Sequence, residues 1–207
     1  MLEAAGYFVA VPELPGHGRR SDEPFSIGES LVTIAETAAG FDDEPVLVGQ
    51  ALGGHLSIQV AAITGAAAAV VALGCGTQAL TWILDSYRIA SAAHQVLPDR
   101  GAALSALAAT TFVGGVPRHT RLSIPGQFFD TLGHLDALNA PSTLARLEIP
   151  VRLVNGQYDR FRMQERAFLS AARDGALVRQ AGVRLAAHIR QPAATAMLVD
   201  RVIQQLP

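Results

Sequence analysis

Residues 46–54 constrain the fold more than any other part of the sequence. Val-Leu-Val-Gly is followed there by Gln-Ala-Leu-Gly-Gly, in the form G-x-A-x-G. The pattern is typical of a buried strand that runs through a glycine turn into a helix. Gly49 and Gly53 flank a turn so sharp that larger side chains would collide with the strand and the helix. Such a turn raises Ala51 above the sheet, and it points the Leu52 amide at any oxyanion formed there.

Composition excludes several classes of protein. The chain has 207 residues, 50% of them hydrophobic and 16% charged, which suits one globular domain rather than a disordered chain. Its net charge is -2 and no basic face stands out, so nucleic acid is not an expected partner. Cys75 is the single cysteine, and no His, Asp or Glu pair has metal-ligand spacing, so neither a disulfide, a metal nor another cofactor is expected.

The chain carries no recognisable targeting or membrane segment. Residues 1–6 lack the basic start and apolar core of a signal peptide. Residues 56–84 are uncharged, but polar residues and glycines interrupt them, as in a buried helix followed by a buried strand. We therefore expect a cytoplasmic monomer or homodimer with no membrane contact.

Apolar runs and helical periodicity alternate along the sequence. Strands are expected at residues 7–11, 45–49, 68–73, 150–156 and 183–186. Helices are expected at residues 26–39, 52–64, 81–96, 102–111, 128–138, 164–172 and 194–205. This alternation predicts an α/β fold with a mostly parallel sheet and helices on both of its faces.

Four ordered segments resemble the α/β-hydrolase superfamily, in its cap-bearing esterase or C–C hydrolase-like branch. Residues 9–21 are similar to its strand and Pro-Gly-His-Gly loop, and residues 45–54 to its nucleophile elbow. Residues 150–159 are similar to the strand and loop that deliver the catalytic acid, and His188 precedes Pro192 where the family has its histidine. The resemblance implies a catalytic triad of position 51, Asp159 and His188, with the Leu52 amide as an oxyanion donor.

Ala51 departs from the family, which has serine at this position. A methyl group cannot attack a carbonyl carbon, so the acyl-enzyme route is closed in the sequence as written. Two explanations remain open: a deliberate trapping variant, or a natural protein that has lost hydrolysis and keeps the pocket for another use.

The resemblance also implies a helical cap. We expect the cap at residues 77–146 and the hydrolase core at residues 1–76 and 147–207. The cap is rich in aromatic side chains, which favours a small apolar organic substrate. The candidate substrate-binding residues are Gln50, Cys75, Trp82, Tyr87 and Phe128.

The start of the chain is a second departure. Residues 1–6 resemble the end of the helix before the family's fourth strand. The family's three earlier strands, the third of which lies between the fourth and the fifth in the sheet, have no counterpart, and neither has the His-Gly loop that gives a second oxyanion donor. Either residues 7–11 pair with residues 46–49, or the working protein has residues upstream of Met1.

Three hypotheses about function follow. The first is a carboxylic ester or related acyl hydrolase whose nucleophile is replaced by Ala51. The second is a non-catalytic protein that binds a small apolar ligand. The third is a lyase or cyclase in which His188 and Asp159 act as a general-base pair.

Overall fold

A computed structural model of the protein describes residues 1–77, 138, 140–182 and 191–207. The chain divides into two compact units, Met1–Thr77 with Leu138–Pro207, and Gln78–Ala137. The second unit lies wholly outside the described residues. Apart from Leu138, so do the helices expected at 81–96, 102–111 and 128–138 and the strand expected at 183–186.

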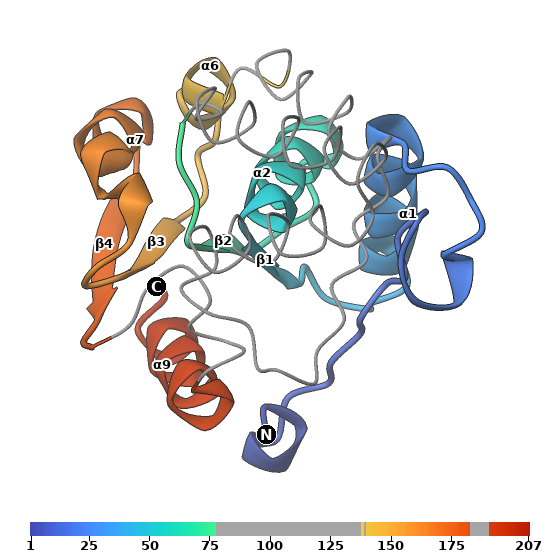
Figure 1. The fold of residues 1–207 in the computed structure, drawn as a ribbon, viewed down its shortest axis with the longest axis horizontal. Coiled ribbons are helices and arrows are strands. Elements are labelled where there is room, and N and C mark those ends of the chain that lie inside the picture. The colour runs from blue at the N-terminus through green and yellow to red at the C-terminus, as the bar shows by residue number, and fades with distance from the viewer. Residues whose placement is uncertain (78–137, 139, 183–190) are drawn as a thin grey trace, which may run out of the picture. The chain divides into compact units, whose positions relative to one another are not determined.

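A parallel four-stranded sheet forms the centre of the first unit (Figure 1). Its strands lie in the order β1 (Val46–Gln50), β2 (Ala69–Leu73), β3 (Val151–Gly156) and β4 (Gly175–Gln180). Val46 pairs with Ala69 and Val70 pairs with Val151, so the strands run in register with their carboxyl ends at one edge. The predicted parallel sheet is confirmed.

Helices cover both faces of this sheet. The helices are α1 (Ile27–Ala39), α2 (Leu52–Thr64), α6 (Ala140–Leu144), α7 (Glu165–Ala171) and α9 (Pro192–Gln204). Short 3-10 helices lie at Glu3–Ala5, Gly18–Arg20 and Arg160–Gln164, the last of which is η4.

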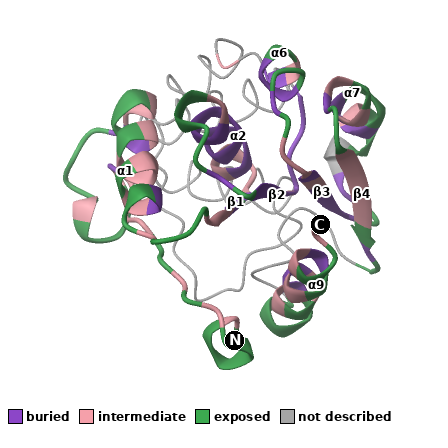
Figure 2. Cartoon of the chain, turned by 180° about the vertical axis from the view of Figure 1, so that it is seen from behind, coloured by how far each residue is buried: buried purple, intermediate pink, exposed green. Residues whose placement is uncertain are grey.

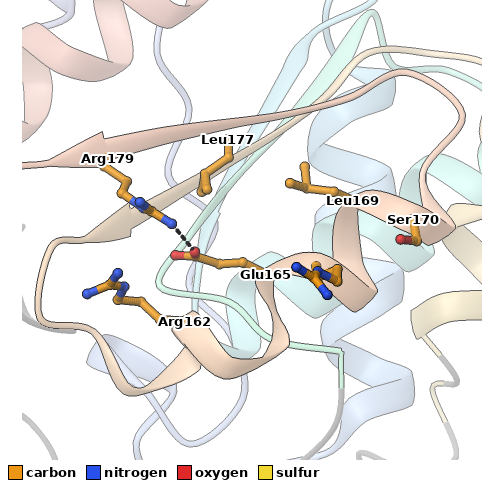
Figure 3. Close-up of a pocket in the computed structure, with 7 residues that line it drawn as sticks. Arg162, Glu165, Leu169, Ser170, Leu177 and Arg179 are labelled. Atoms are coloured by element: carbon orange, nitrogen blue, oxygen red, sulfur yellow. Dashed lines mark hydrogen bonds and ion pairs between the residues drawn. The ribbon is translucent and has the colours of Figure 1, made fainter.

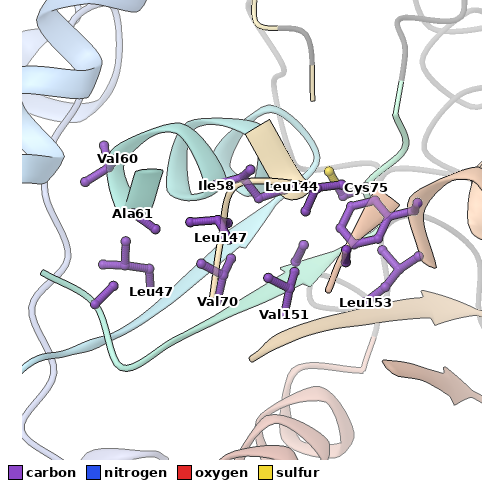
Figure 4. Packing of buried hydrophobic residues seen from close by; sticks show 14 of the residues in the cluster. Leu47, Ile58, Val60, Ala61, Val70, Cys75, Leu144, Leu147, Val151 and Leu153 are labelled. Carbon is purple, nitrogen blue, oxygen red and sulfur yellow. The ribbon is translucent and has the colours of Figure 1, made fainter. Parts of the chain in front are cut away.

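The alternation of side chains along each strand divides the core in two. Leu47, Val70 and Leu153 pack in the larger cluster with residues of α2, α6 and α7 (Figure 4). Val71 and Val154 point to the opposite face and pack with Val202 of α9. Purple buried residues accordingly follow β2, β3 and much of α2 in Figure 2, whereas β4 is mostly pink.

Local signals in the sequence set the helix ends. The Ser26 side chain accepts a hydrogen bond of 3.3 Å from the Glu29 amide, which caps α1. Gly65, with a φ of 64°, ends α2 at the predicted residue. None of the described helices is both long and apolar enough to cross a membrane.

The strand expected at residues 7–11 is absent, so this prediction is wrong. Phe8 and Val11 are 82% and 83% exposed, and β1 pairs only with β2 among the described strands. The apolar run has the composition of a buried strand, but it lacks a neighbouring strand to complete its hydrogen bonds. Pairing between residues 7–11 and 46–49 is thereby ruled out in this structure. Tyr7 instead donates a hydrogen bond of 2.8 Å to Asp200 of α9.

Among the described strands and α-helices, β4 and α6 were not predicted. The β4 strand has only a weak signal in the sequence, because its apolar run is short and the strand is mostly half-buried. The α6 helix lies within residues 138–146, which the sequence analysis assigned to the cap. In the structure these residues belong to the first unit, because Leu144 is buried in the larger core cluster against α2.

Candidate active site

Ala51 occupies a strained turn between β1 and α2. Its φ of 47° and ψ of -112° make it the one described non-glycine residue with a positive φ. An L-residue in such a conformation costs about 1–3 kcal/mol, and such strain gathers at functional sites. The sharp turn predicted from the glycine pattern is therefore present at the predicted residue.

Glycine is required at one position around this turn, and a second glycine makes a close contact. A Cβ at Gly49 would lie 2.1 Å from the carbonyl oxygen of Gly53, so no larger residue fits there. A Cβ at Gly54 would lie 3.2 Å from both the Cβ and the Sγ of Cys75. Gly53 has open space around its would-be Cβ, so the expectation of a steric need at Gly53 is wrong. Instead, Gly54 is the glycine at which the start of α2 lies close to another segment, at Cys75.

The start of α2 leaves a hydrogen-bond donor beside Ala51. The amides of Gly54 and His55 donate to the carbonyl oxygen of Ala51 over 3.1 and 3.3 Å. Within the described part of the chain, the Leu52 amide donates to no acceptor. The first amides of a helix lack partners within the helix and favour negative charge. This geometry suits the oxyanion role that the resemblance implies for Leu52.

Asp159 follows β3 in a turn that is held by hydrogen bonds. Its side chain is buried, with the residue 4% exposed, and its amide donates a hydrogen bond of 3.0 Å to Gly156. Gln157 is held on both sides, because its amide donates to Gln180 over 2.8 Å and its carbonyl accepts from Arg162 over 2.8 Å. Asp159 therefore lies at the same sheet edge as Ala51, at the carboxyl end of a parallel strand.

Cys75 lies between these two positions, just after β2. It is 1% exposed, and the negative charge of Asp159 acts on it. Burial, with a smaller contribution from Asp159, raises the pKa of the Cys75 thiol to about 12. The thiol is therefore neutral and is not a nucleophile at ordinary pH. Gln50, at the end of β1, is half-buried. For both residues, substrate contact stays a prediction.

A buried polar cluster behind the acid turn was not predicted. Asn155 of β3 is fully buried and donates a hydrogen bond of 3.2 Å from Nδ2 to Oε1 of Glu165. Arg179 of β4 donates to Oε2 of the same carboxylate over 2.7 Å. The contacts join β3, α7 and β4, and no spacing in the sequence could have revealed them.

The remaining candidate residues are not described. His188, Trp82, Tyr87 and Phe128 lie outside the described residues, so their roles stay predictions. In the part of the chain that the structure covers, no three His, Cys, Asp or Glu side chains are grouped as a metal site.

Comparison with known proteins identifies the family. The sequence matches the alpha/beta hydrolase family over residues 1–198. A comparison with curated proteins finds no match.

Many solved structures share the fold at low identity. A protein described as a non-heme bromoperoxidase, BpoC from Mycobacterium tuberculosis, aligns with a TM-score of 0.67 and 12% identity over 94% of this chain and 80% of its own. E-2-(acetamidomethylene)succinate hydrolase aligns with a TM-score of 0.64 and 19% identity over 91% of this chain and 78% of its own. An enzyme that degrades N-acyl homoserine lactones aligns with a TM-score of 0.59 and 16% identity over 91% of this chain and 80% of its own. With its parallel sheet, its strained turn at Ala51 and a family match over nearly its whole length, the chain belongs to the alpha/beta hydrolase family.

Proposed function

We propose that the chain has the framework of a carboxylic ester or related acyl hydrolase for a small apolar substrate, with Ala51 in place of the nucleophile. The observation that carries this proposal is the φ of 47° at Ala51. A strained turn of this kind serves to present a side chain at the sheet edge, whatever that side chain is. The narrower assignment to a cap-bearing esterase or C–C hydrolase-like branch is part of the same proposal.

Ester hydrolysis becomes possible when position 51 carries a hydroxyl group. The serine oxygen would attack the substrate carbonyl carbon, while His188 takes the hydroxyl proton. The Leu52 amide would donate to the resulting oxyanion, and Asp159 would orient the imidazole. The leaving alkoxide would then take the proton from His188, and water would release the acid from the acylated serine in the second half of the cycle. With alanine at position 51, the first of these steps cannot occur.

The decisive experiment is Ala51→Ser. Hydrolysis of 4-nitrophenyl acetate by this variant should exceed that of the unchanged chain by about three orders of magnitude or more. A burst of nitrophenolate should accompany the first turnover, because an acyl-enzyme forms. The matched control is Ala51→Ser combined with Asp159→Asn, which keeps the new hydroxyl and removes the charge that orients the base. The proposal fails if folded Ala51→Ser protein gains nothing over the unchanged chain.

The methyl side chain of Ala51 favours a second function, which is binding without hydrolysis. A protein that retains the turn but lacks the nucleophile is suited to binding an acyl compound without cleaving it. A panel of short aryl esters and amides should then raise the unfolding temperature of the unchanged chain with no product formed. Ala51→Ser should leave that stabilisation unchanged and add no turnover.

A further inference from the structure

A hollow of about 420 Å³ lies at the surface beside α7 and β4 (Figure 3). Its lining side chains are mainly arginine and leucine: Arg162, Glu165, Arg166, Leu169, Leu177 and Arg179. Neither Ala51 nor Asp159 is among them. The hollow is shallow and largely open to solvent.

The charges in this hollow do not balance. Arg179 forms an ion pair of 2.7 Å with Glu165, whose side chain is 6% exposed against 49% for Arg179. Figure 3 shows Arg162 and Arg179 on either side of the Glu165 carboxylate. Glu165 is the one acid in the lining, and Arg179 with Asn155 already satisfies it. Two positive charges therefore remain.

Those two charges belong to Arg162 and Arg166, and both side chains are exposed. Arg162 donates one hydrogen bond of 2.8 Å to the carbonyl oxygen of Gln157 and forms no ion pair with a described residue. The Arg166 side chain makes neither a hydrogen bond nor an ion pair with a described residue. Most of the donors on the two guanidinium groups are thus available to a ligand.

Four described arginines outside the hollow are paired with acids. Arg19 with Glu13, Arg20 with Glu23, Arg152 with Asp174 and Arg173 with Glu148 form ion pairs of 2.6–2.9 Å. The chain as a whole has a net charge of -2. Two arginines without an ion pair in one hollow therefore contrast with the net negative charge of the chain, and they favour a negative partner.

We propose that this hollow binds a small organic anion whose phosphate or carboxylate group is held by Arg162 and Arg166. The planar fork of a guanidinium group matches the oxygens of either anion. Leu169 and Leu177 offer an apolar surface for the rest of the ligand. The site is separate from the proposed acyl chemistry, because it does not involve position 51.

Calorimetric titration at constant ionic strength tests the site, with inorganic phosphate, hexyl phosphate and hexanoate as probes and sodium chloride as the reference. At least one probe should bind the unchanged chain, and whether phosphate or carboxylate binds identifies the anion. Hexyl phosphate should bind more tightly than inorganic phosphate if the leucines contribute. None of these titrations measures hydrolysis, so failure of the acyl hydrolase proposal would leave the result unaffected.

Substitutions of single arginines test which side chains hold the anion. Arg166→Gln and Arg162→Gln should each weaken it about tenfold, as expected for loss of a charge-assisted contact. Arg201→Gln changes an exposed arginine of α9 and should leave the affinity unchanged. The Arg166 side chain has no hydrogen bond or ion pair with a described residue, so its variant decides the matter even if Arg162→Gln loosens the Gln157 turn. The proposal is overturned if no probe gives heat beyond chloride, or if Arg166→Gln binds like the unchanged chain.

Discussion

The backbone amide of Ala51 donates a hydrogen bond of 2.9 Å to the carbonyl oxygen of Leu73, the last residue of β2. Gln50 pairs with Leu73 in the sheet, so this contact extends the β1–β2 ladder one residue into the turn. The strained residue is therefore held by backbone contacts, and its side chain contributes little to keeping the turn in place.

Replacing Ala51 with glycine should therefore stabilise the fold. Glycine adopts positive φ without strain, and the relief of about 1–3 kcal/mol exceeds the entropy cost of about 0.4–1 kcal/mol. We expect the free energy of unfolding to rise by about 1 kcal/mol in urea titrations. Ala51→Val should lower it, because a β-branched side chain is strained further at this φ. Equal stability of the glycine and valine variants would contradict the strain argument.

The two glycines on either side of the turn should respond oppositely to alanine. Gly49→Ala places a Cβ 2.1 Å from the backbone of Gly53, and backbone cannot swing aside, so we expect a loss of about 3 kcal/mol or more. Gly53→Ala places its Cβ in open space within a helix, where alanine is favoured by about 0.5–1 kcal/mol. Thermal unfolding of the two variants measured side by side checks both signs.

Gly49 and Gly53 also illustrate how much of the site can be predicted from the sequence. The glycine pattern and the helical spacing after it predicted the turn at Ala51 and the bounds of α2, because both depend on neighbouring residues. The close approach of Gly54 depends on Cys75, which lies about twenty residues away and just after β2, and no local pattern contains that information.

Long-range partners explain the other differences as well. Residues 7–11 have the apolar composition of a strand, yet strand formation needs a neighbour to complete its ladder. The cluster of Asn155, Glu165 and Arg179 joins three elements through side chains that look like ordinary surface residues in the sequence. The elements α1, β1, α2, β2, β3, α7 and α9 were predictable from the sequence, whereas the contacts between elements were not.

Loss of the Glu165 carboxylate charge should destabilise the first unit. In Glu165→Gln, Arg179 loses its buried ionic partner, although its half-exposed guanidinium keeps part of its hydration. We expect a loss of about 2 kcal/mol in the free energy of unfolding. The matched control is Glu148→Gln, which breaks an ion pair of 2.8 Å between side chains 58% and 82% exposed and should cost less than about 0.5 kcal/mol. Similar losses for the two variants would show that burial does not strengthen the Glu165 contact.

His55 makes stability depend on pH. Burial lowers the pKa of His55 from 6.5 to about 4, so the folded chain resists protonation that the unfolded chain accepts. Protonation therefore favours the unfolded state as the pH falls below about 6.5, and the stability that His55 contributes above that pH is lost progressively down to about pH 4. The full loss is about 3 kcal/mol, from about 1.4 kcal/mol per pH unit.

Urea unfolding at about pH 7, 5.5 and 4.5 measures this dependence. His55→Asn should be less stable than the unchanged chain near pH 7, because it leaves space in the core, and the difference should shrink as the pH falls. His17→Asn alters an exposed histidine in the same way and serves as the control. The carboxyl groups titrate alike in all three chains, so their contribution cancels in the comparison. Parallel loss of stability in the His55 variant and the unchanged chain would mean that the buried imidazole is not the source of the pH dependence.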